Sequence, residues 1–212
     1  MHRSVGSGLG EANCLWGLGE LALHRGSDPE AARDLYQRAS EVYRRFGYVL
    51  GEANCLWGLG VLARKCGDTE AARHFYEKAG PLFRQVSDAP GEGNCFWAFG
   101  ELAREDADPA AALRSYNEAL KLYRRVQSSL GEANALLGLG ELAHDRGDTG
   151  AARKHYMKAR SLFHHVGEVR GEAGCLRGLA VLALERGDDA EANAYNAQAA
   201  LFERTGDADG QG

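Results

Sequence analysis

Apolar and small side chains recur three and four residues apart through nearly the whole chain, which is the period of an α-helix. Within residues 55–63 they form two adjacent rows. The pattern stops at residues 67–69, Gly-Asp-Thr, and begins again over residues 72–86. Glycine suits the end of one helix, and Asp or Thr suits the start of the next. The pattern therefore predicts two helices joined by a short turn.

This two-helix unit occurs five times. The glycines that open the copies are residues 10, 51, 91, 131 and 171, so the period is 40 with one insertion near Ser27. A fixed period of this size is typical of a solenoid, in which each unit packs only on its neighbours. We expect a lead-in at 1–8, a single array over 9–206 and a polar tail at 207–212. The expected repeats are about 9–49, 50–89, 90–129, 130–169 and 170–206.

The fifth copy differs most from the others. When its second helix is aligned on Tyr195, it is one residue short and carries Gln198 where the other copies have alanine. A polar residue suits a helix with no further repeat beyond it, so we interpret this copy as a terminal cap.

The small and aromatic residues resemble the tetratricopeptide repeat, whose second helix reads Ala-x3-Phe and then Ala. In the second copy they are Gly60, Ala72, Tyr76 and Ala79. The corresponding residues of three other copies are Gly19, Ala32, Tyr36 and Ala39; Gly100, Ala112, Tyr116 and Ala119; and Gly140, Ala152, Tyr156 and Ala159.

The second copy departs from the family pattern at three positions: Leu56 replaces Trp, Ala63 replaces Tyr and Arg84 replaces Pro. Without that proline the second helix can continue, which accounts for the longer period. Repeats of this length resemble those of kinesin light chains, of spindle-orientation adaptors such as LGN and Pins, and of sensor arrays of signalling NTPases. The resemblance implies an all-α, right-handed α-solenoid of five helix-turn-helix repeats, whose first helices line a concave, peptide-binding groove.

Charge and composition exclude several classes of protein. The net charge is −5 with acids and bases mixed along the chain, which argues against nucleic acid and anionic membranes as partners. No uncharged run approaches the ~18 residues that span a bilayer, and residues 1–9 lack the apolar core of a signal peptide. A cytoplasmic location is therefore expected.

No motif for catalysis, a cofactor or a metal stands out. The Gly-x-Gly-x-x-Ala stretch at 17–22 recurs with the repeat and follows no strand, so it does not indicate a nucleotide site. The adjacent His164 and His165 point to different faces of a helix and lack metal-ligand spacing. Cys14, Cys55 and Cys95 share one position with Cys175, where the fourth copy has alanine. We expect these four to be buried, unpaired thiols. We expect no enzyme, cofactor or metal.

One stripe of the first helices remains outside the core rows, and by resemblance it faces the groove. All three tryptophans lie on it, each three residues after an asparagine. Tryptophan suits recognition surfaces, and an asparagine amide can hold the main chain of a peptide. The candidate residues are Asn13, Trp16, Glu20, Asn54, Trp57, Arg64, Asn94, Trp97, Glu101, Arg104, Asn134, Leu137, Glu141 and Arg177.

Two interpretations of this stripe stay open. In one, the tryptophans hold a peptide. In the other, each tryptophan packs between adjacent first helices and each asparagine bonds the neighbouring backbone. Arginines that end the second helices, such as Arg44 and Arg84, are interpreted as a solvated ridge matched to the helix dipole, with a docking patch for an acidic partner as the alternative.

The sequence therefore predicts a non-catalytic scaffold or adaptor that binds a peptide or helix of a partner protein in its groove. Glu20, Glu101 and Glu141 favour a basic ligand, tempered by Arg64 and Arg104. The alternative is a structural array that associates with itself end to end through its terminal repeats.

Overall fold

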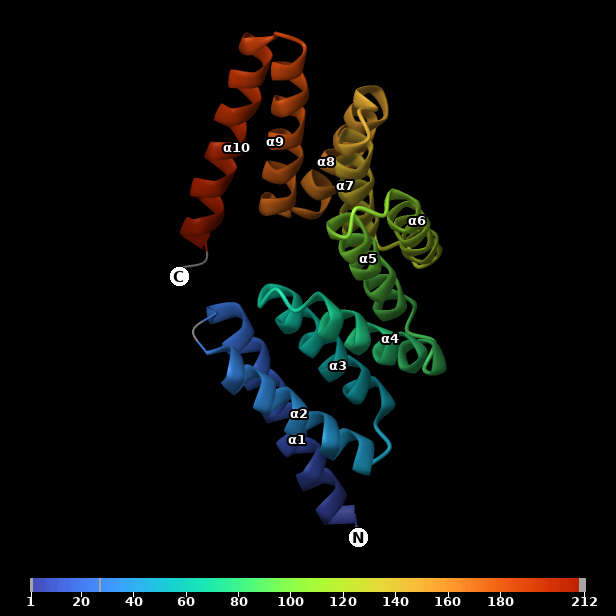
Figure 1. The fold of residues 1–212 in the computed structure, drawn as a ribbon. Helices are drawn as coiled ribbons and strands as arrows, with labels where there is room; N and C mark the ends of the chain where they lie inside the picture. The colour runs from blue at the N-terminus through green and yellow to red at the C-terminus, as the bar shows by residue number, and fades with distance from the viewer. Residues whose placement is uncertain (1, 27, 210–212) are drawn as a thin grey trace. The chain divides into compact units, whose positions relative to one another are not determined.

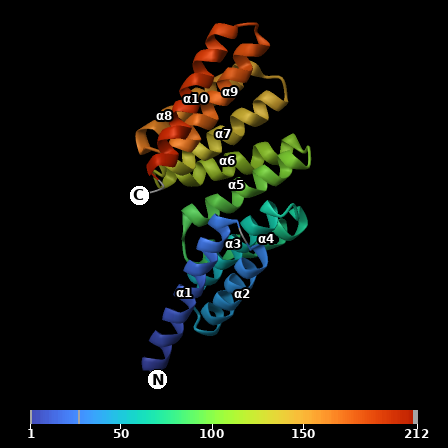
Figure 2. The same cartoon turned by 90° about the vertical axis from the view of Figure 1, so that its left-hand side faces the viewer.

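The structure is a computed structural model that describes residues 2–26 and 28–209, and within these residues the chain forms helices joined by turns, with no strand. Figures 1 and 2 show the helices arranged in pairs joined by short turns. The helices are α1 (His2–Arg25), α2 (Pro29–Arg45), α3 (Val49–Lys65), α4 (Thr69–Gln85), α5 (Ala89–Glu105), α6 (Pro109–Arg125), α7 (Ser129–Asp145), α8 (Thr149–Val166), α9 (Val169–Glu185) and α10 (Asp189–Asp209). The all-α repeat solenoid predicted from the sequence is confirmed.

Helix contacts divide the chain into two compact units, residues 1–102 and 103–212. In the first unit α1 packs on α2, α2 on α3 and α3 on α4. In the second unit α6 packs on α7, α7 on α8, α8 on α9 and α9 on α10. Within each unit these helices thus contact their neighbours along the chain, as a repeat architecture requires. No described helix is long and apolar enough to cross a membrane.

The second helix of each pair begins after an aspartate. The Asp68 carboxylate accepts a 2.9 Å hydrogen bond from the backbone N–H of Ala71, and Asp148 does the same for Ala151. These bonds satisfy donors that have no partner inside the helix. A residue with positive φ lies between the end of the preceding helix and each cap, as at Gly67 (φ +80°). This is the turn chemistry predicted for residues 67–69.

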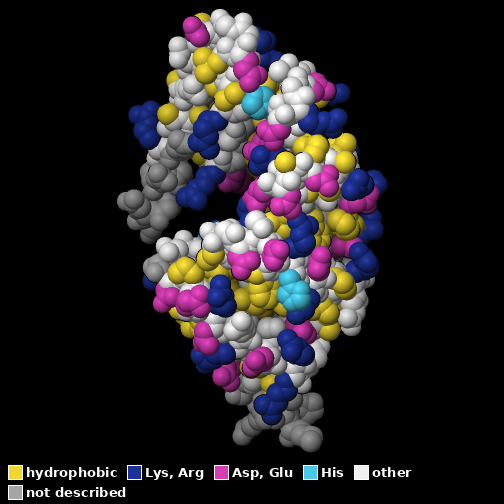
Figure 3. Space-filling model, viewed as in Figure 1, with side chains coloured by type: hydrophobic (Ala, Val, Ile, Leu, Met, Phe, Trp, Pro, Cys, Tyr) yellow, Lys and Arg dark blue, Asp and Glu magenta, His cyan; other side chains and the backbone are white. Residues whose placement is uncertain are grey.

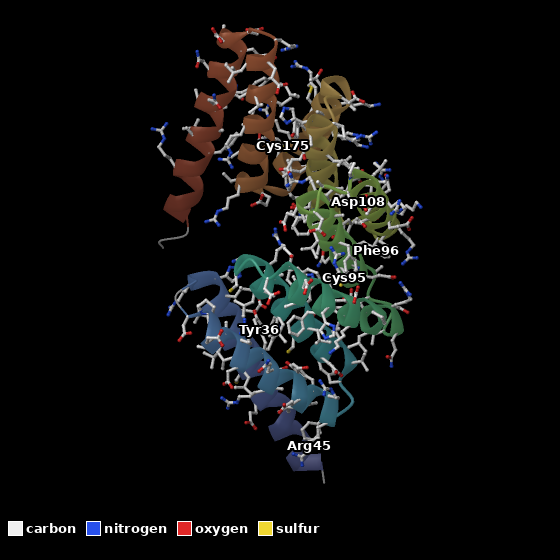
Figure 4. All side chains as sticks on the ribbon, in the orientation of Figure 1. Tyr36, Arg45, Cys95, Phe96, Asp108 and Cys175 are labelled. Carbon is white, nitrogen blue, oxygen red and sulfur yellow. The ribbon has the colours of Figure 1, made fainter. Side chains whose placement is uncertain are left out.

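The Gly-x-Gly pairs of the first helices hold aromatic rings. The Tyr36 ring of α2, labelled in Figure 4, lies against Gly19 of α1 and Gly58 of α3. A Cβ atom on Gly58 would be 2.8 Å from this ring, closer than real Cβ contacts allow. In the second unit the Tyr156 ring lies in the same way against Gly140 and Gly178. The glycines are therefore packing positions that let helix pairs approach, and the Gly-x-Gly pattern has a structural cause.

A second ring packs at the opening glycine of each copy after the first. The Tyr43 ring lies against Gly51, where a Cβ atom would be 2.6 Å from it. The Phe163 ring lies against Gly171 in the same way, at 2.5 Å. The repeated opening glycine therefore marks the contact between one second helix and the first helix of the next copy.

An ion pair accompanies this second ring contact. The arginine after the ring pairs with the glutamate after the opening glycine, at 2.8 Å for Arg44–Glu52 and 2.7 Å for Arg84–Glu92. In the second unit Arg124 pairs with Glu132 at 3.0 Å, and at the same repeat position His164 makes a 3.1 Å hydrogen bond with Glu172. The arginines thus tie consecutive helices together, a role that the helix-dipole interpretation did not include.

The predicted alignment of the fifth copy is wrong. Asp188 accepts a hydrogen bond from the backbone N–H of Glu191 at 3.0 Å, which starts α10 in step with α8. Ala192 and Ala199 are therefore buried in the alanine positions, whereas Gln198 is exposed. Asn196 stands where the ring of the other copies would be. The cap sets the phase of this helix, and Tyr195 is displaced by one position.

The burial of each cysteine depends on the contacts between copies. Cys55, Cys95 and Cys175 are buried, and their burial raises the pKa of each thiol from 9.0 to about 12. Cys55 packs among Ala12, Leu15, Ala39 and Tyr43 of the preceding copy. Cys14 is exposed, so the prediction that all four are buried is wrong there, because no described residue covers that face of α1.

Candidate functional site

The first unit contains a hollow of about 240 Å³ that combines parts of three first helices and the turn before α5. We call it the tryptophan hollow. It brings together five of the residues predicted from the sequence: Trp16 and Glu20 of α1, Asn54 and Trp57 of α3, and Asn94 of α5. Its other lining residues are Phe83, Asp88, Pro90 and Gly91.

The two tryptophans of this hollow are half-buried. Trp57 packs against two core clusters formed by α3, α4 and α5, one containing Phe83 and the other Tyr76, while it also lines the hollow. The indole N–H groups of Trp16 and Trp57 have no hydrogen-bond partner among the described residues. An unsatisfied buried donor costs about 1–3 kcal/mol and is uncommon in folded proteins. The tryptophans therefore serve packing and form the wall of the hollow at the same time.

The asparagines differ in what they contact. Tyr43 donates a hydrogen bond from its hydroxyl to Asn13 Oδ1 at 2.6 Å. Phe83 occupies the position of Tyr43 in the second copy and has no hydroxyl. The Asn54 side chain has no hydrogen-bond partner within residues 2–26 and 28–209, so its amide is available to the tryptophan hollow. For Asn13, the bond is to a tyrosine hydroxyl and not to the backbone, unlike the interpretation given above.

Acidic groups dominate the charge of the hollow. Glu20 and Asp88 line it, and none of its lining residues is a lysine or arginine. Tyr36 donates a hydrogen bond to Glu20 at 2.7 Å, which fixes this carboxylate. Burial, and then this bond, raise the pKa of Tyr36 far above its usual 10.0, so the hydroxyl stays a donor. The carboxylates therefore favour a ligand that carries positive charge.

The remaining stripe residues of the first unit lie outside the hollow. Trp97 is half-buried, packs beside Tyr76 and also has an unpartnered indole N–H among the described residues. Arg64 is half-buried. Glu101 is buried, so little of its carboxylate is accessible for a ligand.

In the second unit, the predicted residues make contacts of other kinds, and Arg104 lines a hollow of about 350 Å³ with Leu142 and Asp145. Arg104 pairs with Glu141 at 2.9 Å and with Asp145 at 3.4 Å, so these predicted ligand contacts neutralise each other. Asn134 is half-buried, and Arg177 is exposed. Leu137 packs against the core cluster around Tyr156. Acidic and basic side chains are interspersed on the surface shown in Figure 3, in keeping with the mixed charge of the sequence.

Sequence reasoning missed Phe83, Asp88 and Pro90, because they come from a second helix, a turn and the first turn of α5, and not from the stripe. The change from Tyr43 to Phe83 at one repeat position was the available signal. It also missed a second hollow, of about 320 Å³, in the second unit. Its residues are Met157, Arg160, Ser161, His164, Glu172, Leu179, Tyr195 and Phe202. Tyr195 and Phe202 do not follow the repeat, so periodicity could not place them.

The fold defines this protein as an α-helical repeat solenoid. One profile of the tetratricopeptide repeat matches residues 52–125, and a second matches residues 5–41 and 98–163. Together they match most of the chain, so the chain belongs to the tetratricopeptide repeat family. No curated protein matches the chain.

Several solved structures are similar in fold. BtubC (BKLC) from P. vanneervenii is 16% identical, with a TM-score of 0.67 over 97% of this chain and 90% of that one. A putative kinesin light chain of Podosopora anserina, with nearly identical TPR-like repeats, is 11% identical, with a TM-score of 0.64 over 91% of this chain and 95% of that one. A Rap protein complexed with Competence and Sporulation Factor is 15% identical, with a TM-score of 0.79 over 91% of this chain and 54% of that one. The present chain thus spans about half the length of that Rap protein.

Proposed function

We propose that this chain is a non-catalytic interaction module that binds a peptide segment of a partner protein at the tryptophan hollow. The observation that carries the proposal is the meeting of Trp16, Asn54 and Trp57, from two different first helices, around one hollow. Residues that are far apart in the sequence and share a repeat position are thereby available to one ligand.

The chemistry of the hollow suits one peptide side chain and the main chain beside it. About 240 Å³ is below the roughly 300–1,000 Å³ of pockets that enclose a drug-sized ligand. The faces of Trp16 and Trp57 can pack on an apolar stem or on a cation. The Asn54 amide can both donate to and accept from a peptide bond. Glu20 and Asp88 favour lysine or arginine in the segment that is bound.

Family membership supports this kind of function, because repeats of this family serve protein interactions. The similar Rap structure is a complex with Competence and Sporulation Factor, which shows that this fold can hold such a factor in that protein. An adaptor or scaffold role follows if the bound segment belongs to a larger partner.

Selection of peptides from a random displayed library tests the proposal. Peptides bound by the full chain are measured by titration calorimetry against Asn54→Ala and Trp57→Ala. An exposed position outside the hollow, Glu77→Ala, is the matched control. We expect about tenfold or greater loss of affinity for the two hollow variants, as for residues central to an interface, and no loss for the control. Equal affinity of all variants would overturn peptide binding at this hollow.

A further inference from the structure

One face of α1 carries the residues that elsewhere bury the contact between copies, yet it is exposed. Residues of the first copy correspond to those 41 positions later, so Leu18 and Leu21 correspond to Leu59 and Leu62. Leu59 and Leu62 are 3% and 4% exposed, packed on Tyr36 and its neighbours. Leu18 and Leu21 are 52% and 45% exposed. The outer face of α1 is defined here by Gly10, Glu11, Cys14, Gly17, Leu18 and Leu21.

This face has two empty ring positions. A Cβ atom on Gly10 or on Gly17 would meet nothing within 4 Å. The corresponding Gly51 and Gly58 hold the rings of Tyr43 and Tyr36. Gly10 and Gly17 are seven residues apart, which is two helical turns and about 10.5 Å along α1. A helix with two rings at that same spacing would fill both positions.

The outer face of α1 also carries a carboxylate, that of Glu11. Glu11 corresponds to Glu52, which pairs with Arg44 of the preceding copy at 2.8 Å. Glu11 is exposed and makes no ion pair within the described residues. The partner that completes this face therefore needs a basic residue directly after its second ring, as at Tyr43 and Arg44.

From these three features we infer that the outer face of α1 docks a helix of a partner protein with the pattern Ala-x3-Tyr-x2-Ala-x3-(Tyr or Phe)-(Arg or His). This pattern is present in α2, α4, α6 and α8. The first ring of each of these helices is already buried in its own copy. In α10 the first ring position is Asn196, so another copy of the described chain does not offer the pattern at that end. The occupant is a helix on a different polypeptide, docked as one copy of this repeat docks on the next.

The chain supplies its own probe for this surface. Residues 108–126 contain Ala112, Tyr116, Ala119, Tyr123 and Arg124 in the required order, behind the Asp108 cap. A synthetic peptide of this sequence is added to the full chain, and the alkylation rate of Cys14 is followed by mass spectrometry. Cys66 is also exposed and lies outside the outer face, so its rate is the internal reference. A second form fuses the peptide to the N-terminus through a Gly/Ser linker, which raises its effective concentration to roughly millimolar.

We expect Cys14 to react roughly tenfold more slowly when the peptide is at about ten times its Kd, because only unbound protein reacts. The rate of Cys66 should not change. A peptide with Tyr116→Ala and Tyr123→Ala should give no protection. Gly10→Gln with Gly17→Gln in the chain should also abolish it, and both substitutions lie in open space, so the fold is retained. Loss of protection with Glu11→Arg and its return with the Arg124→Glu peptide would confirm the charge contact.

The other outcomes count against the inference. No protection of Cys14 by either form of the peptide would overturn it. Protection of Cys14 that rises with the concentration of the chain alone would identify a second copy as the occupant and overturn the choice of a different polypeptide. Protection that disappears with Trp57→Ala and persists with the glycine substitutions would place the peptide in the tryptophan hollow, which would also overturn it.

Discussion

The Tyr43 hydroxyl donates a hydrogen bond to Asn13 at 2.6 Å, and the corresponding Phe83 gives Asn54 no such bond. The presence of one hydroxyl oxygen thus determines the state of the asparagine. Asn13 is hydrogen-bonded within its own copy, whereas the amide of Asn54 is available to the tryptophan hollow. Because both asparagines occupy the same repeat position, the difference between them is set by the second helix and not by the stripe.

We expect Phe83→Tyr to weaken peptide binding at the tryptophan hollow. The added hydroxyl would engage the Asn54 amide, as Tyr43 engages Asn13, and would also occupy part of the hollow. Calorimetric titration with a selected peptide measures the loss. The free energy of unfolding should rise by at most about 0.5–1.5 kcal/mol, the net value of one hydrogen bond.

The reverse substitution, Tyr43→Phe, is its control. It should leave affinity at the hollow unchanged, because neither Tyr43 nor Asn13 lines it. It should lower the free energy of unfolding by about 1 kcal/mol through loss of the bond. If Phe83→Tyr leaves affinity intact, the Asn54 amide does not contact the peptide.

We expect Trp57→Ala to cost about 2–3 kcal/mol of stability and to weaken peptide binding strongly. The stability loss should lie below the roughly 3–5 kcal/mol of a fully buried aromatic, since Trp57 is half-buried. Thermal melts and titration measure the two effects. Leu56→Ala is the contrast, because Leu56 is buried beside it and does not line the hollow. A large loss of stability with unchanged binding for Trp57→Ala would leave packing as its only role.

We expect Gly58→Ala to destabilise the protein by about 1–3 kcal/mol through overpacking, because its Cβ would be 2.8 Å from the Tyr36 ring. Gly17→Ala, at the same position of the first copy, meets nothing within 4 Å. It should stabilise α1 by up to about 1 kcal/mol, the difference in helix propensity. Chemical denaturation of the two variants checks this pair. Equal effects would mean that the ring contact is not tight.

We expect stability to fall as the pH rises from about 9 toward 12. Burial raises the pKa of the Cys55, Cys95 and Cys175 thiols from 9.0 to about 12. In that range unfolding releases their protons, so each thiol lowers stability by up to about 1.4 kcal/mol per pH unit, whereas below pH 9 its contribution is fully present. Denaturation of a triple Cys→Ala variant across this range should show a shallower slope.

We expect Ala107→Gly to raise the free energy of unfolding by about 0.5–1 kcal/mol. Ala107 follows α5 with a φ of +56°, a left-handed conformation that disfavours residues with a Cβ atom. Gly67 has the same role after α3, so Gly67→Ala should destabilise by a similar amount. Denaturation curves of the two variants should move in opposite directions, and a loss of stability on Ala107→Gly would contradict the assignment of strain.

The helix pairs could be predicted because Leu59 and Leu62 show the helical period locally and the copies repeat it. The meeting of Trp16 with Asn54 was also implied, since both lie on one stripe. The contribution of Phe83 and Asp88 to the hollow could not be predicted, because it depends on how one helix pair packs against the next.

Other residues show the limits of repeat equivalence. Cys14 shares its position with Cys55, yet burial there depends on a preceding copy that packs against it. Arg104 and Glu141 each looked available to a ligand, but they lie 37 positions apart and meet only when adjacent helices pack. In α10, Tyr195 suggested the wrong register, because the cap at Asp188 determines the helix phase more strongly than an aromatic side chain does.

The packing of rings on glycines has a consequence at the level of the gene. Because α2, α4, α6 and α8 present rings at the same two positions and the first helices meet them with a glycine or, at Ala98, with alanine, the junction that follows each of these helices does not depend on which copies it joins. Recombination that removes or duplicates 40 codons in register, such as those for 50–89, would bring Tyr43 to Gly91 and leave a complete contact. An exchange out of register would set rings against leucines. Arrays of this kind can therefore change length by whole copies in a single genetic event.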